Sequence, residues 1–303
     1  MADTTGGGAI HISVFGMSDV GHIRKNNEDN FVICNLTTGE VGLSSSLCEH
    51  ELGQLGSLFM VADGMGGEAS GEVASQLAME TVPKRLHDNL KSLGTLSEAN
   101  FVILLREAVE YANQIIFQKA LTDPAYHGMG TTTTAAALFG RHLFVGQVGD
   151  SRCYLIRGRQ IAQLTRDQTL LNYLKDIGAE LPIDPEKDSR KSILTQAVGS
   201  SEMLDVKVTY SAVNQGDRIL VCSDGLYNMV PDTDLLEIAN RGDGLPDRCK
   251  ALIDEANANG GTDNITVILA ELSGPGLPSH DMELPIECKP FSEEDFSRRI
   301  GEP

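Results

Sequence analysis

The segment from Ser57 to Ser75 constrains the fold more than any other part of the chain. Leu58 to Ala62 form a short apolar run, which is typical of a strand buried on both faces, and the second half of the segment predicts a helix beginning near Glu68. Asp63 therefore stands where a buried strand ends, with glycines at 64, 66, 67 and 71 behind it. A buried carboxylate is costly unless a positive charge neutralises it, and glycines leave the space beside it open. A metal ion is the simplest partner for Asp63.

Two other interpretations of this segment stay open. Asp63 could cap the following helix, with the glycines forming only a turn. Gly64 to Ala69 also fit the G-x-G-x-x-A pattern of dinucleotide-binding proteins, which likewise lies between a strand and a helix. Against that pattern, Asp63 would place a negative charge beside the pyrophosphate. In addition, the acidic residues about twenty positions further on, such as Asp88, lie in a polar helical stretch rather than at a second strand end.

Composition narrows the class of partner. The chain has 303 residues, enough for one large domain or two, and its 24 basic and 43 acidic side chains give a formal charge of −19. This balance disfavours nucleic acid or an anionic membrane as the main partner and suits a protein that binds divalent cations. The six cysteines include no C-x-x-C pair, and the N-terminus lacks a basic segment followed by an apolar core, so we expect a reduced, cytoplasmic protein. No apolar run is long enough for a membrane span.

Three regions are expected along the chain: a flexible lead over 1–9, one folded domain over 10–272, and a peripheral or flexible tail, rich in proline and acidic residues, over 273–303. The alternation of residues 10–15 predicts a strand, with Phe31–Cys34 as its partner strand. The following stretches are expected to be a surface loop over 35–56, a mobile flap over 166–192, helices over about 97–121, 168–177, 233–240 and 246–259, and a last strand over 265–272.

Acidic residues recur at the predicted strand ends, and each alone is typical of an exposed turn. They are Glu28, Asp29, Asp63, Asp150, Asp224 and Asp263. If the sheets bring these ends to one edge, the carboxylates would repel one another and raise one another's pKa unless cations were bound. Oxygen ligands without histidine or cysteine favour Mg²⁺ or Mn²⁺ over zinc.

Such a site predicts phosphoryl chemistry. Two ions about 3.5–4 Å apart can share and acidify a bridging water or hydroxide that attacks phosphorus. Arg24, close to the Glu28–Asp29 pair, is the natural phosphate clamp because a guanidinium grips two oxygens at once. The sequence contains no G-x-S-x-G elbow and no C-x₅-R loop for a covalent route, and its seven histidines stand apart from the acidic positions.

Taken in order, the motifs around these residues resemble those of the metal-dependent protein phosphatase 2C family, in its compact bacterial-type branch. The resemblance covers about residues 12–272, and the ordered set is far more specific than any one motif. The motifs are Arg24-x-x-Asn27-Glu28-Asp29, Val61-Ala62-Asp63-Gly64-Met65-Gly66-Gly67 with Gly71-Glu72-x-Ala74-Ser75, Gly128-Met129-Gly130-Thr131-Thr132, Val148-Gly149-Asp150-Ser151-Arg152, Cys222-Ser223-Asp224-Gly225-Leu226, and Asp263-Asn264-Ile265-Thr266.

The resemblance implies an α+β fold, a four-layer α/β/β/α sandwich of two antiparallel sheets flanked by helix pairs, with 10–272 as the phosphatase catalytic domain. It also implies hydrolysis of phosphoserine and phosphothreonine with two Mg²⁺ or Mn²⁺ ions, and a third ion in bacterial-type members. The resemblance also implies roles for the site residues. Asp63 bridges both metals, the Gly64 carbonyl binds one of them, and Asp224 and Asp263 complete the other. Asp29 and Glu28 act mainly through water, Asp150 holds the third metal, and Arg24 binds the substrate phosphate.

Two departures from the family pattern stand out. Animal members carry a histidine after the Asp-Gly pair as general acid, whereas this chain has Met65, as bacterial relatives commonly do. A thioether cannot donate a proton, so the general acid is unassigned. The flap, with Arg166-Asp167-Gln168 and Asp188-Ser189-Arg190, follows the family only loosely, which leaves the substrate preference open.

The expected partners are phosphorylated proteins, the substrates of a bacterial Ser/Thr kinase, and the expected state is a monomer. The alternative is a non-catalytic module of the same fold that binds phosphoproteins or a kinase. That alternative predicts lost acidic ligands, and none of the expected positions is missing here.

Overall fold

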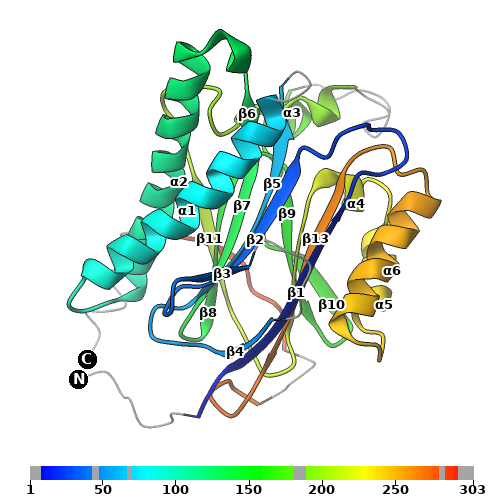
Figure 1. Cartoon of the computed structure of the whole chain (residues 1–303). Helices are drawn as coiled ribbons and strands as arrows, with labels where there is room; N and C mark the ends of the chain where they lie inside the picture. The colour runs from blue at the N-terminus through cyan, green and yellow to red at the C-terminus, as the bar shows by residue number, and fades with distance from the viewer. Residues whose placement is uncertain (1–7, 43–47, 67–69, 180–188, 280–283, 293–303) are drawn as a thin grey trace.

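Two antiparallel sheets face each other, and a pair of helices covers the outer face of each (Figure 1). The computed structural model describes residues 8–42, 48–66, 70–179, 189–279 and 284–292. The layers run α1 and α2, then the larger sheet, then the smaller sheet, then α5 and α6. The predicted α+β class and its four-layer α/β/β/α sandwich are therefore confirmed.

The smaller sheet has the strand order β10-β9-β12-β13-β1-β4. Its strands are β1 (His11–Asp19), β4 (Cys48–Glu51), β9 (Arg152–Arg157), β10 (Gln160–Gln163), β12 (Arg218–Cys222) and β13 (Ile265–Ser273). The larger sheet has the order β14-β11-β8-β7-β5-β2-β3, and β6 pairs with β5 beside it. Its strands are β2 (Asp29–Asn35), β3 (Glu40–Gly42), β5 (Ser57–Met65), β6 (Gly130–Thr131), β7 (Thr133–Phe139), β8 (His142–Val148), β11 (Lys207–Ala212) and β14 (Lys289–Pro290).

The helices fall close to the predicted ranges. They are α1 (Ser70–Ser92), α2 (Glu98–Thr122), α3 (Leu170–Asp176), α4 (Asp224–Tyr227), α5 (Asp232–Ala239) and α6 (Leu245–Ala258). The start of α2 is fixed by Ser97, whose side chain accepts a hydrogen bond from the Asn100 N–H, as an N-cap should. The start predicted near Glu68 for the first helix lies outside the described residues. Within the described ranges, no helix combines the length and apolar character needed to cross a membrane.

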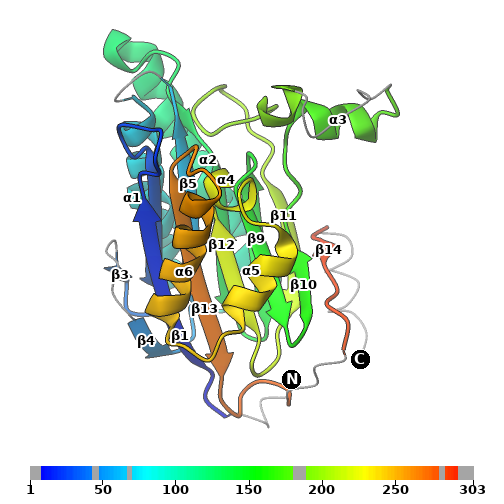
Figure 2. The same cartoon turned by 90° about the vertical axis from the view of Figure 1, so that its right-hand side faces the viewer.

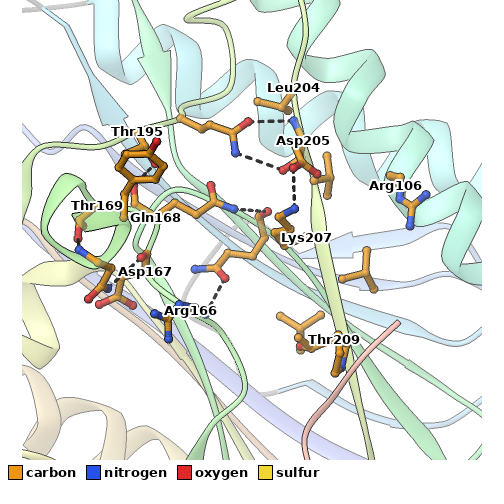
Figure 3. A pocket seen from close by; sticks show the side chains of 18 of the residues that line it. Arg106, Arg166, Asp167, Gln168, Thr169, Thr195, Leu204, Asp205, Lys207 and Thr209 are labelled. Carbon is orange, nitrogen blue, oxygen red and sulfur yellow. Dashed lines mark hydrogen bonds and ion pairs between the residues drawn. The ribbon is translucent and has the colours of Figure 1, made fainter. Parts of the chain in front are cut away.

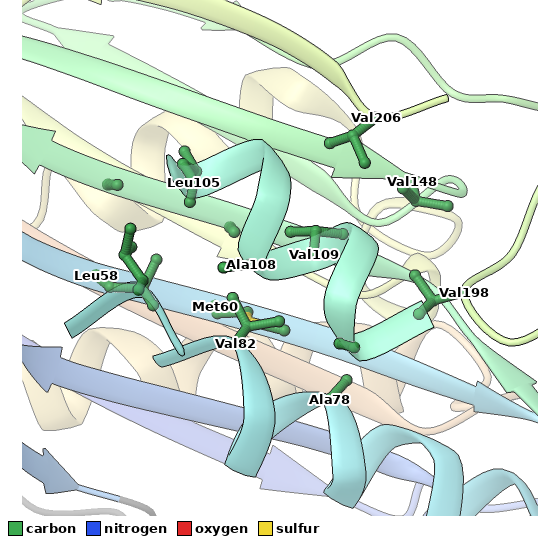
Figure 4. Close-up of a cluster of buried hydrophobic side chains, with 14 of the residues drawn as sticks. Leu58, Met60, Ala78, Val82, Leu105, Ala108, Val109, Val148, Val198 and Val206 are labelled. Carbon is green, nitrogen blue, oxygen red and sulfur yellow. The ribbon is translucent and has the colours of Figure 1, made fainter. Parts of the chain in front are cut away.

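Strand β5 is buried on both faces, as its apolar run predicts. Leu58 and Met60 point into the layer between the larger sheet and the helices, whereas Phe59 and Val61 point into the layer between the two sheets. Figure 4 shows the outer layer, with Ala78 and Val82 of α1 and Leu105, Ala108 and Val109 of α2 packed against β5. The strand that carries Asp63 is thus held from both sides by the core.

The predicted pairing of residues 10–15 with Phe31–Cys34 is wrong. Strand β1 pairs with β13 and β4 in the smaller sheet, whereas β2 pairs with β5 and β3 in the larger one. The two strands face each other across the sandwich, where the Phe31 ring occupies the space that a side chain at Gly16 would need. An alternating pattern fits either sheet, so it cannot choose the neighbour.

Two segments expected to be irregular contain strands. The surface loop predicted over 35–56 includes the short strands β3 and β4. In the tail, β14 pairs with β11, the Phe291 N–H donates to the Val208 carbonyl, and the Phe291 side chain is buried in the core. The expectation of a peripheral or flexible tail is therefore wrong for its described residues 284–292.

Candidate functional site

Asp63 and Asp29 lie directly opposite each other, because the antiparallel register of β5 and β2 pairs these two positions at the strand ends. Strand β12 of the smaller sheet leads into Asp224, the first residue of α4, and the turn between β8 and β9 carries Asp150. The charges of Asp29, Asp224, Asp150 and Asp263 all raise the pKa of Asp63. The two sheets therefore bring carboxylates from distant parts of the sequence to one end of the sandwich.

Burial and mutual repulsion raise the pKa of each central carboxyl group. Desolvation is the main cause for Asp29, whose pKa rises to about 7 although the hydroxyl of Ser223 donates to it. Desolvation and the Asp224 charge raise the pKa of Asp150 to about 7, and desolvation with the Asp263 charge raises that of Asp224 to about 6. For Asp63, desolvation followed by the Asp29 charge raises the pKa well above its usual range. At neutral pH this cluster favours bound protons or bound cations.

The donor set fits divalent cations. Two buried oxygens, Asp29 Oδ1 and Asp224 Oδ1, have no hydrogen-bond partner in the described structure, and such oxygens are costly unless something positive binds them. All the converging side-chain groups are carboxylates, which Mg²⁺ and Mn²⁺ prefer. In the described ranges, however, no three acidic, histidine or cysteine side chains are already arranged closely enough to hold an ion. The carboxylates are gathered, but they do not form a closed cage.

Arg24, Asp263 and Glu28 form the solvent-facing rim of the cluster. The Arg24 guanidinium lies 2.7 Å from Asp263 Oδ2, with about half of its side chain exposed (54%). A cavity of about 330 Å³ is lined by Arg24, Glu28, Asp63, Gly64 and Asp263 among others. Desolvation raises the pKa of Glu28 above its ordinary value. A guanidinium group at the mouth of an acidic cavity can bind an anionic group that enters the cavity.

The backbone around Asp63 is tightly fixed. The Asp63 N–H donates to the Thr132 hydroxyl at 2.9 Å, and the Asp63 carbonyl accepts from the Thr132 N–H at 2.8 Å and the Thr131 hydroxyl at 2.9 Å. A Cβ atom at Gly64 would lie 2.2 Å from the Gly71 carbonyl oxygen and 2.6 Å from that of Glu28. Three backbone segments therefore meet at Gly64, and only glycine fits there.

Two residues support the site although the sequence motifs gave them no role of their own. Ser223 donates its hydroxyl to Asp29 Oδ2 at 2.6 Å and accepts from the Thr266 N–H, so it joins both sheets beneath the carboxylates. The buried Asn264 amide donates to the Val20 and Asn26 carbonyls and accepts from the Glu28 N–H, which fixes the loop that carries Arg24. Both residues adjoin a predicted acidic ligand, and a polar residue beside such a position is the only sequence signal for them.

The surroundings of Gly64 argue against dinucleotide binding. Strand β5 is antiparallel to both β2 and β7, whereas the dinucleotide fingerprint belongs to a parallel strand-helix-strand unit. No histidine of the described residues lines the acidic cavity. Met65, the residue after Gly64, is partly exposed (40%) beside the cluster.

Helix α3 belongs to the predicted flap and projects from the end of the sandwich (Figure 2). Between it and β11 lies a second pocket of about 730 Å³, separate in its lining from the acidic cavity. Figure 3 shows Arg166, Asp167 and Gln168 on one side of this pocket and Asp205 and Lys207 on the other. The larger pocket lacks the converging carboxylates, so the smaller cavity is the candidate reaction site.

Comparisons with known proteins agree with the geometry. A family model described as Protein phosphatase 2C matches residues 47–243, which include Asp63, Asp150 and Asp224. The chain is 34% identical over 255 residues to the serine/threonine phosphatase stp of Listeria monocytogenes, covering 84% of this chain and 93% of that protein.

Solved structures are similar over nearly the same extent. The serine/threonine phosphatase PstP/Ppp of Mycobacterium tuberculosis has a TM-score of 0.71 and 31% identity, covering 87% of this chain and 99% of that one. The catalytic domain of PstP in complex with two manganese ions has a TM-score of 0.69 and 31% identity, with the same coverage. The similarity therefore extends over most of both sheets and their helices.

Proposed function

Because this chain belongs to the protein phosphatase 2C family and is a phosphoprotein phosphatase, we propose that it hydrolyses phosphoserine and phosphothreonine at the carboxylate cluster around Asp63. The observation that carries this proposal is the meeting of Asp29, Asp63, Asp150 and Asp224 at one end of the sandwich, where burial and the charges of neighbouring carboxylates raise the pKa of each. The complex of PstP with two manganese ions supports a divalent metal as the partner of these groups.

The residues would divide the metals between them. Asp63 would bridge two ions, the Gly64 carbonyl would bind one of them, and Asp224 and Asp263 would hold the other. Asp29 and Glu28 would act mainly through water, and Asp150 would hold a third ion. When bound, two divalent ions supply an acidified water and take up charge on the phosphoryl oxygens.

The chain's own residues account for binding and orientation. Arg24 would bind two phosphoryl oxygens, releasing Asp263 from its present ion pair to act as a ligand. The fixed backbone of Asp63 and the Ser223 hydrogen bond to Asp29 would hold the carboxylates in place while substrate enters. Met65 cannot protonate the leaving alcohol, so that proton must come from another group.

The substrates follow from the family. Phosphoproteins are the substrates of a protein phosphatase, and we propose the targets of a bacterial Ser/Thr kinase, since the relatives named above are bacterial. The net charge of −19 argues for protein rather than nucleic acid substrates. We propose that the enzyme acts as a monomer in the cytoplasm with Mg²⁺ or Mn²⁺.

Phosphate release from a phosphothreonine peptide tests the proposal. The full chain should release phosphate with Mn²⁺ or Mg²⁺ and stop when a chelator is added. Asp63→Asn should abolish turnover, whereas Asp88→Asn, at an exposed position of α1, should retain it. Tight phosphopeptide binding without metal-dependent release would instead support a non-catalytic module.

A further inference from the structure

We propose that the ion pair of Arg152 and Asp167 is a positioning element that ties the root of the flap to the loop carrying Asp150, so that the placement of the flap root, Asp167 and Gln168, sets the orientation of the Asp150 carboxylate. The inference rests on the proposed function, in which Asp150 holds the third ion. Neither Arg152 nor Asp167 lines the acidic cavity, so they act through other residues.

The first connection joins the flap root to strand β9. Asp167 accepts from Arg152 Nε at 3.0 Å and 3.2 Å and from Arg152 Nη2 at 2.7 Å, so both carboxylate oxygens are engaged. The Gln163 amide donates to the same carboxylate at 2.8 Å. Both side chains of the ion pair are largely shielded, with 21% and 12% of their surface exposed. A shielded, two-pronged pair of this kind fixes direction as well as distance.

The second connection joins Arg152 to the carboxylate cluster. The Arg152 guanidinium lies 3.6 Å above the centre of the Tyr227 ring, within the range of a cation–π contact. Tyr227 ends helix α4, which begins with Asp224, and its hydroxyl donates to the Asp150 carbonyl at 3.1 Å. Arg152 thereby fixes the ring whose hydroxyl holds the backbone of Asp150.

A third connection grips the same loop from the flap side. The Gln168 N–H donates to the Gly149 carbonyl at 3.0 Å, and Gln168 Oε1 accepts from the Gly149 N–H at 2.9 Å. Gly149 has a φ of +96°, and a Cβ there would lie 2.7 Å from the Thr132 side chain. The loop is therefore held between the flap root and the Thr132 side chain, whose hydroxyl fixes Asp63.

Two consecutive flap residues reach the same loop, Asp167 through Arg152 and Tyr227 and Gln168 directly, which distinguishes this arrangement from an isolated surface ion pair. The nearby pair of Arg166 and Asp176 in the same flap shows the contrast, since both side chains are more than half exposed. Losing the Asp167 carboxylate should loosen Asp150, while losing Asp176 should not.

Titration of the full chain with Mn²⁺, followed by calorimetry, tests the proposal. Asp167→Asn should weaken at least tenfold the binding of the ion that Asp150→Asn loses, as loss of a residue supporting a metal ligand commonly does, and should leave the affinities of the other ions within about twofold. The kcat at limiting Mn²⁺ should fall and recover at excess Mn²⁺, with the peptide KM unchanged. Asp176→Asn, the matched control, should titrate like the wild type.

A double-variant comparison separates positioning from general destabilisation. If Asp167 acts through Asp150, then Asp150→Asn combined with Asp167→Asn should lose no more affinity than Asp150→Asn alone. Tyr227→Phe keeps the ring but removes the hydroxyl that donates to Asp150, so it should reproduce the loss even if Asp167→Asn fails to fold.

Several outcomes of these experiments would contradict the proposal. The positioning role would be overturned if the wild type bound only two ions, or if the losses of affinity in the double variant were additive. It would also be overturned if both Asp167→Asn and Tyr227→Phe bound Mn²⁺ as the wild type does. A wild-type chain that neither binds Mn²⁺ nor releases phosphate would refute the proposed function itself, which is a different outcome from a working enzyme that is indifferent to Asp167.

Discussion

Replacing Asp224 by asparagine should stabilise the metal-free protein while abolishing its activity. Burial and the Asp263 charge raise the pKa of Asp224 from an ordinary 3.8 to about 6. As the pH rises, Asp224 therefore ionises in the unfolded chain before it ionises in the folded chain. The free energy of unfolding falls between about pH 4 and pH 6, and the whole loss is present above pH 6. Asparagine has a similar shape and no charge, and its amide can donate to a neighbouring carboxylate.

The size of the gain follows from the gap between the two pKa values. A gap of about two pH units corresponds to about 3 kcal/mol at pH 8, but only about half of that at pH 5, where the folded group is still protonated. For a chain of this length, about 3 kcal/mol raises Tm by about 5 °C. These values are upper figures, because the other carboxylates share the repulsion that Asp224 relieves.

Thermal and urea unfolding with a chelator, at pH 5 and pH 8, measure the gain. Saturating Mn²⁺ should reverse the order of stability, because the wild type then gains the binding free energy of an ion that the variant holds poorly. Asp88→Asn, at an exposed position on α1, should change stability by less than about 0.5 kcal/mol at either pH. A variant less stable than wild type at pH 8 without metal, or equally stabilised at both pH values, would refute the reasoning.

Three further substitutions test other parts of the structure. Arg24→Ala should raise the KM for a phosphopeptide about tenfold with a smaller change in kcat, because it removes a charge-assisted contact to substrate; steady-state kinetics showing a loss only in kcat would contradict this. Gly71→Ala places a Cβ 2.7 Å from Glu28 Oε2, so Mn²⁺ titration should show weaker binding, and unchanged affinity would mean that Glu28 is dispensable. Phe291→Ala should lower the free energy of unfolding by about 3 kcal/mol in urea, and a loss below about 1 kcal/mol would show that the tail contributes little to the core.

The acidic positions could be predicted because buried strands ending in Asp-Gly are rare enough to stand out when several occur in one chain. Asp63 and Asp224 each follow an apolar run, and the helices packed on β5 carry a clear 3.6-residue period. These local patterns predicted most helix ranges to within a few residues, whereas the four layers of the fold were implied only by the resemblance to the phosphatase family. The sequence also identified the flap helix α3, although its direction away from the sandwich depends on contacts far along the chain.

Strand partners and supporting hydrogen bonds could not be predicted in the same way. The alternation in β1 is the same whether its neighbour is β2 or β13, so only the packed sandwich decides between them. Strand β14 has two residues, too few for any periodicity to register. Asn264 connects loops that are more than 230 positions away in the sequence, and nothing local distinguishes it from a turn residue.

The pocket between α3 and β11 shares no lining residue with the acidic cavity, so a ligand bound there would not have to compete with substrate phosphate. A compound that competes with a phosphate ester among metal ions must carry negative charge of its own, and such compounds cross lipid bilayers poorly. Four acidic and three basic side chains line the pocket, so their charges nearly cancel, and about 730 Å³ is room for a neutral, drug-sized molecule. Chemists could therefore seek cell-permeable ligands at a wall that includes Asp167 and Gln168, away from the carboxylates themselves.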